Sequence, residues 1–95
     1  MQVSDRLAAY VRRTFADQDA NTLLDALDQF DATIFGLQDP ERCALAIVLL
    51  VQQGITPQDA FRLARTDWRD LLMAAELAYG NWPTRVADLL TDSPD

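Results

Sequence analysis

The chain of 95 residues contains no histidine, no lysine and a single cysteine, Cys43. Without histidine it cannot form a Ser-His-Asp or Cys-His catalytic arrangement, nor a zinc site with imidazole ligands. One cysteine excludes an internal disulfide and a thiolate cluster within one chain, and its place in an apolar run fits a reducing compartment. No other set of catalytic residues is evident, so we expect neither an enzyme nor a bound cofactor.

Long apolar segments are also missing. The longest uninterrupted apolar run covers residues 43–51, nine positions, whereas a membrane-spanning helix needs about 20. The start of the chain lacks the basic and apolar regions of a signal peptide. We therefore expect a cytoplasmic protein that does not enter a membrane.

Negative charge, by contrast, is abundant. Asp and Glu together number 15 against eight arginines, and the net charge is −7. Arginine without lysine, and aspartate in place of glutamate, fit a GC-rich bacterial or phage genome. The negative charge repels the phosphates of nucleic acids. We expect the partner to be another protein, with a basic protein as one candidate, rather than nucleic acid.

Apolar residues make up 49% of the sequence and recur at helical spacing, with no strand-like alternation and no internal repeat. This composition can bury a core, and the spacing predicts one all-α domain over residues 1–95. We expect a compact bundle of five or six short helices around an apolar central helix.

The central helix has the clearest boundaries. Asp39 is its predicted N-cap, Pro40 occupies the first helical position, and Gly54 after Gln53 fits a left-handed C-cap. Residues 43–51 are apolar on every face, which indicates a helix surrounded by protein. A buried strand is the rival interpretation. Because this segment is expected to be buried, the binding surface should lie on the outer helices.

Two helices are expected before the central one. Ser4 is the predicted N-cap of the first. The polar residues 16–21 indicate a loop, after which Asn21 or Thr22 caps a second helix that ends at Gly36.

The remaining helices follow the central one. Thr56 is the predicted N-cap of the next helix. Asp67 caps another, which ends at Gly80, and whether these are two helices or one bent helix stays open. A last helix covers residues 83–90, and residues 91–95 form a frayed tail.

Part of this second half resembles a known group of proteins. Residues 41–47 lead through Gly54 to residues 64–76, which contain the segment Asp67-Trp68-Arg69-Asp70. This pattern resembles small bacterial helical proteins of unknown function that share an Asp-aromatic-Arg-Asp segment before an Ala-rich helix. The resemblance implies a small bacterial helical protein and carries no activity or site residues with it.

One pattern concerns metal. The chain has oxygen ligands at positions 1, 3, 5, 9 and 12 of a twelve-residue segment, as in a calcium-binding loop. Thr22 stands where such a loop needs glycine, and the twelfth position has Asp instead of the longer Glu. A divalent-metal-binding helical domain is therefore an alternative, and we favour an acidic linker before a capped helix. The candidate ligands are Asp17, Asp19, Asn21, Asp25 and Asp28.

Two charged faces are candidates for partner binding. An acidic row, with one Asp every three residues on the second helix, could imitate phosphates or meet a basic protein. An arginine row at i, i+3 and i+7 would share one face if its helices are continuous, and could bind a carboxylate or a phosphate. Solvated helix faces are the competing explanation for both rows. The acidic row is Asp25, Asp28 and Asp31, and the arginine row is Arg62, Arg65 and Arg69.

These observations favour an acidic protein–protein interaction module, an adaptor, regulator or inhibitor of bacterial or phage origin. A helix-turn-helix-like DNA-binding regulator over residues 47–64 is an alternative, which the net negative charge opposes. Self-association as a homo-oligomer through an apolar outer surface that includes Trp82 is a further alternative.

Overall fold

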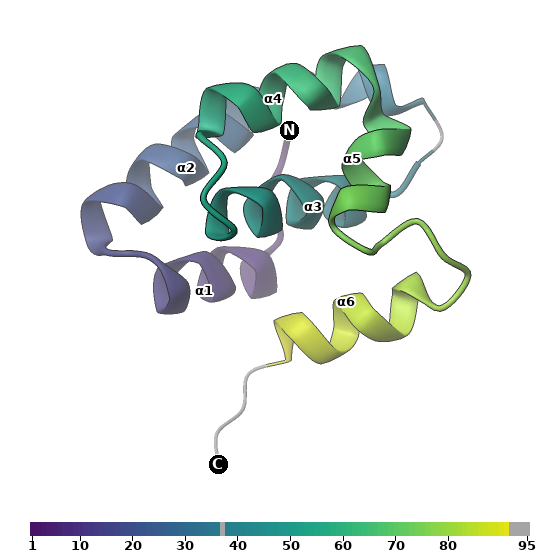
Figure 1. The fold of residues 1–95 in the computed structure, drawn as a ribbon. Helices are drawn as coiled ribbons and strands as arrows, with labels where there is room; N and C mark the ends of the chain where they lie inside the picture. The colour runs from purple at the N-terminus through teal and green to yellow at the C-terminus, as the bar shows by residue number, and fades with distance from the viewer. Residues whose placement is uncertain (37, 92–95) are drawn as a thin grey trace.

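The computed structural model describes residues 1–36 and 38–91, which form six α-helices and one 3₁₀ helix and contain no strand. The predicted all-α class is confirmed. The principal extents of the molecule are 36 × 29 × 23 Å. The elements, shown in Figure 1, are α1 (Asp5–Thr14), α2 (Asp17–Gln29), the 3₁₀ helix η1 (Ala32–Phe35), α3 (Pro40–Gln52), α4 (Pro57–Thr66), α5 (Trp68–Ala74) and α6 (Trp82–Leu90).

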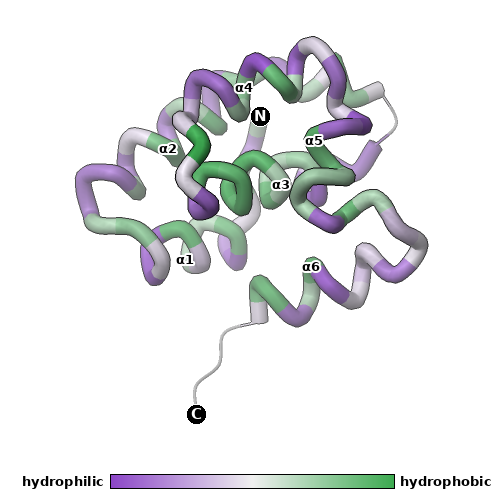
Figure 2. Tube along the Cα trace, viewed as in Figure 1, coloured by the Kyte–Doolittle hydropathy of each residue, from purple (hydrophilic) through white to green (hydrophobic). Residues whose placement is uncertain are grey.

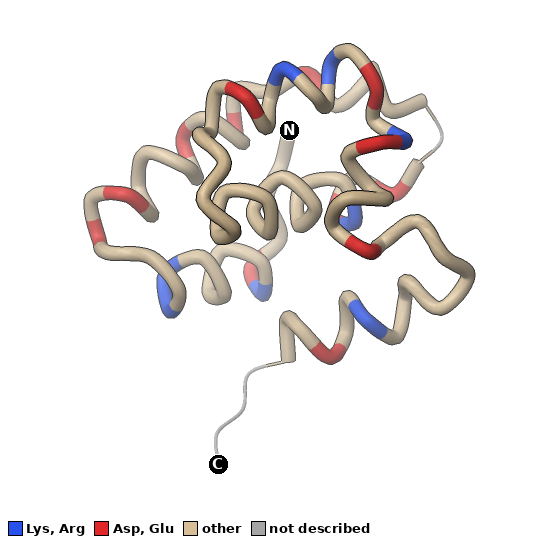
Figure 3. The backbone as a smooth tube through the Cα atoms, in the orientation of Figure 1, with Lys and Arg blue, Asp and Glu red and all other residues tan. Residues whose placement is uncertain are grey.

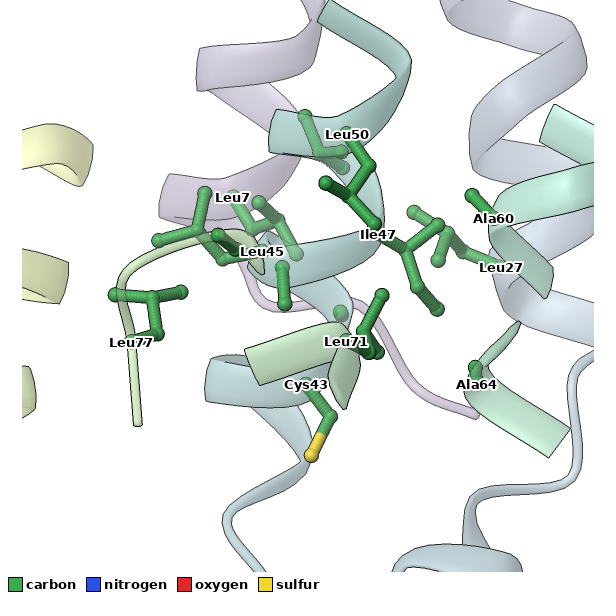
Figure 4. Packing of buried hydrophobic residues seen from close by; sticks show 14 of the residues in the cluster. Leu7, Leu27, Cys43, Leu45, Ile47, Leu50, Ala60, Ala64, Leu71 and Leu77 are labelled. Atoms are coloured by element: carbon green, nitrogen blue, oxygen red, sulfur yellow. The ribbon is translucent and has the colours of Figure 1, made fainter. Parts of the chain in front are cut away.

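Helix α3 lies at the centre of the fold. It packs against α1, η1, α4, α5 and α6, while α2 packs against α1. Residues 43–48 are at most 1% exposed, and in Figure 2 α3 is the most continuously apolar helix. Figure 4 shows Leu45, Ile47 and Leu50 of α3 among side chains from the surrounding helices. The predicted apolar central helix is confirmed, and the rival strand is wrong.

Both ends of α3 follow the sequence signals. The Asp39 carboxylate accepts the backbone N–H of Glu41 at 2.9 Å, and Pro40 occupies the first turn, where its missing N–H costs nothing. At the other end Gly54 has a φ of +106°. The N–H of Ile55 then reaches the Leu50 carbonyl at 3.1 Å. This is a Schellman arrangement, which needs a residue in the left-handed region.

The predicted loop over residues 16–21 is wrong, because α2 already begins at Asp17. Ala20 is 1% exposed and continues the apolar side of Leu23 one turn towards the N-terminus. The polar residues 17–19, 21 and 22 are exposed and lie on the solvent side of this helix. Asp17, in its first turn, is favoured by the positive end of the helix dipole. Asn21 and Thr22, the predicted caps, lie inside α2.

Helix α2 also ends earlier than expected, at Gln29. Asp31 starts η1 instead, accepting the backbone N–H of Thr33 at 3.0 Å and its hydroxyl at 2.6 Å. Such local bonds from Asp compete with a continued α-helix. Gly36, with a φ of +64°, ends η1 rather than α2.

The first residue of the chain covers the C-terminal end of α2. The Met1 amino group donates to the carbonyls of Leu27 at 3.2 Å, Asp28 at 2.7 Å and Phe30 at 2.6 Å. A helix end leaves carbonyls without intrahelical partners and carries partial negative charge. The cationic amino group satisfies both requirements.

Asp67 separates α4 from α5. Its backbone has φ −157° and ψ 84°, and its carboxylate accepts the N–H of Asp70 at 3.2 Å. Thr56 caps α4 in the predicted way, accepting the N–H of Asp59 at 3.1 Å. The alternative of one bent helix is thus excluded, and the Asp67 cap is confirmed.

The expected end of the next helix at Gly80 is wrong, because α5 ends at Ala74. Glu76 has a φ of +60°, and the N–H of Leu77 donates to the Leu72 carbonyl at 2.8 Å. This repeats the Schellman arrangement with glutamate where glycine is usual. Leu77 is fully buried, so its burial fixes the turn.

The end of the chain follows the prediction for residues 83–90, since α6 covers Trp82–Leu90. Of the predicted tail over residues 91–95, only Thr91 belongs to the described part of the chain. Among the described residues, no helix combines the length and apolarity needed to cross a membrane.

One charged side chain is buried at the junction of α3 and α6. Arg42 is 9% exposed. Its Nε donates to the Leu77 carbonyl at 2.7 Å, and Nη1 donates to the Gln38 side chain at 3.1 Å. Arg42 therefore attaches the segment after α5 to the first turn of α3.

Candidate binding groove

A groove of about 600 Å³ lies where the end of α2 and η1 face α4. We name it the α2–α4 groove. Its floor is apolar and its rim carries amide and charged side chains. The floor is formed by Ala26, Phe30, Ile34 and Phe61, and the rim by Gln29, Asp31, Gln58, Arg62 and Arg65.

Phe30 organises the floor. Its ring centroid lies 5.6 Å from that of Phe35 and 5.2 Å from that of Phe61. Both Phe30 and Phe61 are 7% exposed and line the groove, so each buries most of its side chain in the core and leaves a small part accessible. Aromatic contacts at these distances are favourable, which supports this arrangement of the floor.

Two guanidinium groups line the α4 side. The guanidinium of Arg65 lies 5.8 Å from the centre of the Phe30 ring. The Nη1 atom of Arg62 lies 3.7 Å from an Asp59 carboxylate oxygen, and both of these side chains are more than half exposed. A guanidinium held in this way keeps in-plane N–H donors for a further acceptor. Figure 3 shows the two basic positions of α4 close together along that helix.

The opposite rim carries a carboxylate. Hydrogen bonds from the Thr33 hydroxyl and the Thr33 backbone N–H lower the pKa of Asp31 below its usual value. Asp31 is therefore ionised at neutral pH. The groove has an anionic rim on the η1 side and a cationic rim on the α4 side.

The structure brings some of the predicted binding residues together and separates others. Asp31, Arg62 and Arg65 meet at the groove, although Asp31 and Arg62 are far apart in the chain. Arg69 is on α5, with its guanidinium 5.3 Å from the centre of the Trp68 ring. The helix break at Asp67 therefore interrupts the predicted arginine row.

The other two members of the acidic row stand apart from the groove. Asp25 and Asp28 are exposed on α2 and do not line it. Helix α2 carries no basic residue, so the charged side chains that it exposes to solvent are all acidic.

The predicted metal loop is not formed. Residues 17–28 belong to a continuous helix, which rises about 1.5 Å per residue and so spreads the candidate ligands along its axis instead of wrapping them around one ion. Within residues 1–36 and 38–91 there is no group of three or more Asp, Glu, His or Cys side chains able to hold a metal. The five candidate ligands were Asp17, Asp19, Asn21, Asp25 and Asp28.

The predicted helix-turn-helix segment and Trp82 have the following positions in the structure. In the segment 47–64, predicted as a helix-turn-helix, the single basic side chain is Arg62, and it lines the α2–α4 groove together with Asp31. Trp82 is half-buried against the core. The large apolar side chains exposed in the described residues are Ile55, Met73 and Tyr79, at 37%, 56% and 59%.

The cysteine is not available for chemistry. Cys43 is fully buried in α3, and burial raises the pKa of its thiol to about 11. The thiolate is the nucleophilic form, so this side chain stays unreactive at neutral pH.

The floor of the groove is not apparent from the sequence. Phe30, Ile34 and Phe61 have the helical spacing of core residues, and nothing in that spacing distinguishes a fully buried side chain from one that lines a groove. Comparison of the chain with protein-family models, with curated proteins and with solved structures gave no significant match.

Proposed function

We propose that this protein is a protein–protein interaction module, an adaptor, regulator or inhibitor, and that the α2–α4 groove is its binding site. The observation that carries the proposal is the groove itself, with an apolar aromatic floor between two charged rims. Its volume of about 600 Å³ lies in the range of sites that hold a ligand. Apolar grooves between helices commonly receive a segment of a partner protein.

The ionisable groups that line the groove support binding over catalysis. They are Asp31, Arg62 and Arg65. Two of the three are arginines, which remain protonated and cannot act as a general base. Asp31 already accepts two hydrogen bonds from Thr33. The arrangement supplies recognition by charge and apolar contact, and no nucleophile is paired with a base.

A peptide selection tests the proposal. A random phage-displayed peptide library is selected on the folded protein, and the peptides obtained are measured by fluorescence polarisation. The variant Ala26→Trp fills the groove floor, while Ala9→Trp makes the same change on the exposed side of α1. We expect Ala26→Trp to weaken binding by about tenfold or more and Ala9→Trp to leave it unchanged. Equal binding to both variants rejects the groove as the site.

The acidic side of α2 supports a second candidate surface. Asp25 and Asp28 are exposed on a helix without basic residues, which favours a basic partner through long-range attraction. Binding there should weaken with added salt and with Asp25→Asn/Asp28→Asn. If neither added salt nor the double substitution weakens binding, this surface is not the binding site.

The proposal also covers the origin, the cellular location and the oligomeric state of the module. A bacterial or phage origin and a cytoplasmic location rest on composition and on the resemblance around Asp67-Trp68-Arg69-Asp70. A homo-oligomer would use the exposed Met73 and Tyr79. Sedimentation equilibrium over a range of concentrations distinguishes a monomer from such an assembly.

A further inference from the structure

The charge along the α2–α4 groove is opposite to that of the whole molecule. The chain has a net charge of −7, yet the ionisable groups lining the groove are two arginines and one aspartate. The groove thus presents one excess positive charge on a negative surface. This inversion limits the kind of segment that can lie there.

Neither arginine is neutralised by a strong ion pair. Arg62 has only a long contact of 3.7 Å to Asp59, between two well-exposed side chains, and such pairs are worth little. For Arg65, the part of the chain that the structure describes offers a ring contact with Phe30 and no carboxylate. Both guanidiniums retain capacity for an incoming anion.

The two guanidiniums share one side of α4, and Arg65 is also pre-positioned. Arg62 and Arg65 are three residues apart on α4, so they emerge on one side of that helix. The Phe30 ring restrains Arg65, and restraint before binding lowers the entropy lost on binding. One carboxylate, or two neighbouring ones, can accept from both side chains.

We propose that the α2–α4 groove receives an acidic segment of a partner protein, with an Asp or Glu within one helical turn of an aromatic or large aliphatic residue. The carboxylate pairs with Arg62 and Arg65, and the apolar side chain packs on Phe30 and Phe61. Asp31, on the other rim, repels a second carboxylate and accepts an N–H donor. This inference rests on the proposed function of the groove.

Charge also decides between a protein segment and other anions. A nucleic acid or an anionic membrane presents many negative charges, which the net charge of −7 repels. A second copy of this chain meets the same repulsion. In a short acidic segment, the carboxylate lies against the cationic rim only, and the apolar residues pack on the aromatic floor.

The test compares short fluorescent peptides that share one pattern of Leu and Phe and differ at flanking positions. These positions carry Asp and Glu, their amides Asn and Gln, or Lys. We expect the acidic peptide to bind about tenfold more tightly than its amide form, and its affinity to fall with ionic strength. The lysine form should bind more weakly than the amide form.

Variants locate the preference. Arg62→Gln/Arg65→Gln should abolish the difference between the acidic and amide peptides, because the acidic peptide loses its cationic partners. Arg12→Gln/Arg69→Gln removes the same charge at exposed positions outside the groove and should leave the preference intact. Circular dichroism melts confirm that all variants fold.

The outcomes separate the two proposals. If amide or lysine peptides bind as well as acidic ones, and Ala26→Trp blocks them, the acidic occupant is wrong and the groove remains a binding site. If no peptide responds to Ala26→Trp, both proposals fall. If sedimentation shows a dimer that Arg62→Gln/Arg65→Gln dissociates, the occupant is a second copy and the inference is overturned.

Discussion

The guanidinium of Arg42 lies 4.7 Å from the centre of the Trp82 ring, so the first turn of α3 and the first turn of α6 are in direct contact. Cation–π contacts of a desolvated arginine are worth about 2 kcal/mol. The same side chain donates to the Leu77 carbonyl. Arg42 is thus the polar connection between the central helix and the last one.

Replacing this arginine should be costly. We expect Arg42→Ala to lower the free energy of unfolding by about 2–4 kcal/mol, because it removes the ring contact and the donor to a buried carbonyl. Urea denaturation measures the change. The exposed substitution Arg12→Ala should stay within about 0.5 kcal/mol of the parent. Similar losses for both variants would show that Arg42 has no special role.

The turn after α5 predicts a stabilising substitution. Glu76 has a φ of +60° and is exposed, and glycine adopts this backbone without the strain from Cβ. We expect Glu76→Gly to raise the free energy of unfolding by about 1 kcal/mol. Glu76→Ala removes the same charge but keeps Cβ, and should give no gain. A gain in both variants would attribute the effect to charge.

Cys43 should be protected from thiol reagents. Its burial, and its pKa of about 11, predict almost no reaction with a disulfide reagent in the native state at pH 8, and rapid reaction in urea. The variant Ala9→Cys adds an exposed thiol on α1 as an internal reference. One fast and one protected thiol are expected. Two fast thiols would contradict the packing of α3.

The link between α1 and α3 should depend on pH. Arg6 donates from Nε to a Glu41 carboxylate oxygen at 2.8 Å and from Nη2 to the other oxygen at 2.5 Å. This interaction with Arg6, with help from the Ser4 hydroxyl, lowers the pKa of Glu41. A lowered native pKa stabilises the protein above the ordinary glutamate pKa, and that stability is lost as the pH falls through the native pKa.

A double-mutant cycle between Arg6→Gln and Glu41→Gln measures this contribution. Because the Arg6 side chain is 49% exposed, we expect a coupling of only about 1 kcal/mol at pH 7. It should fade as the pH falls through the lowered native pKa of Glu41. A coupling that persists in acid would exclude the ion pair as its source.

The amino terminus offers a selective chemical test. Because the chain has no lysine, the Met1 amino group is its only primary amine, and an acetylating reagent followed by hydroxylamine, which removes acetyl groups from tyrosine, leaves that amine alone modified. Acetylation removes the charge at the C-terminal end of α2. We expect a loss of about 1 kcal/mol in unfolding free energy, seen as a lower melting temperature. An unchanged melt would show that these contacts contribute nothing.

Short-range signals in the sequence were sufficient for most helix boundaries. Asp39, Thr56 and Asp67 cap helices because each carboxylate or hydroxyl reaches a backbone N–H two or three residues away. The errors came from tertiary contacts. Burial of Ala20 extends α2 into the expected loop, and burial of Leu77 places Glu76 in a conformation that its residue type disfavours.

The candidate site was predictable in its charges and not in its shape. Asp31, Arg62 and Arg65 were recognised from their spacing along the chain. The groove exists because Phe30, which directly follows α2, and Phe61 of α4 place their rings 5.2 Å apart. The spacing of residues along the chain cannot predict that distance, because the distance depends on how α2 and α4 pack in the fold.

The central position of α3 has a consequence for folding. Three of the helices that cover it, α4, α5 and α6, follow it in the chain. Until they have packed against it, much of its apolar surface lacks a cover, and a partly folded chain in this state is prone to aggregate. A fragment that ends after α3 should therefore aggregate.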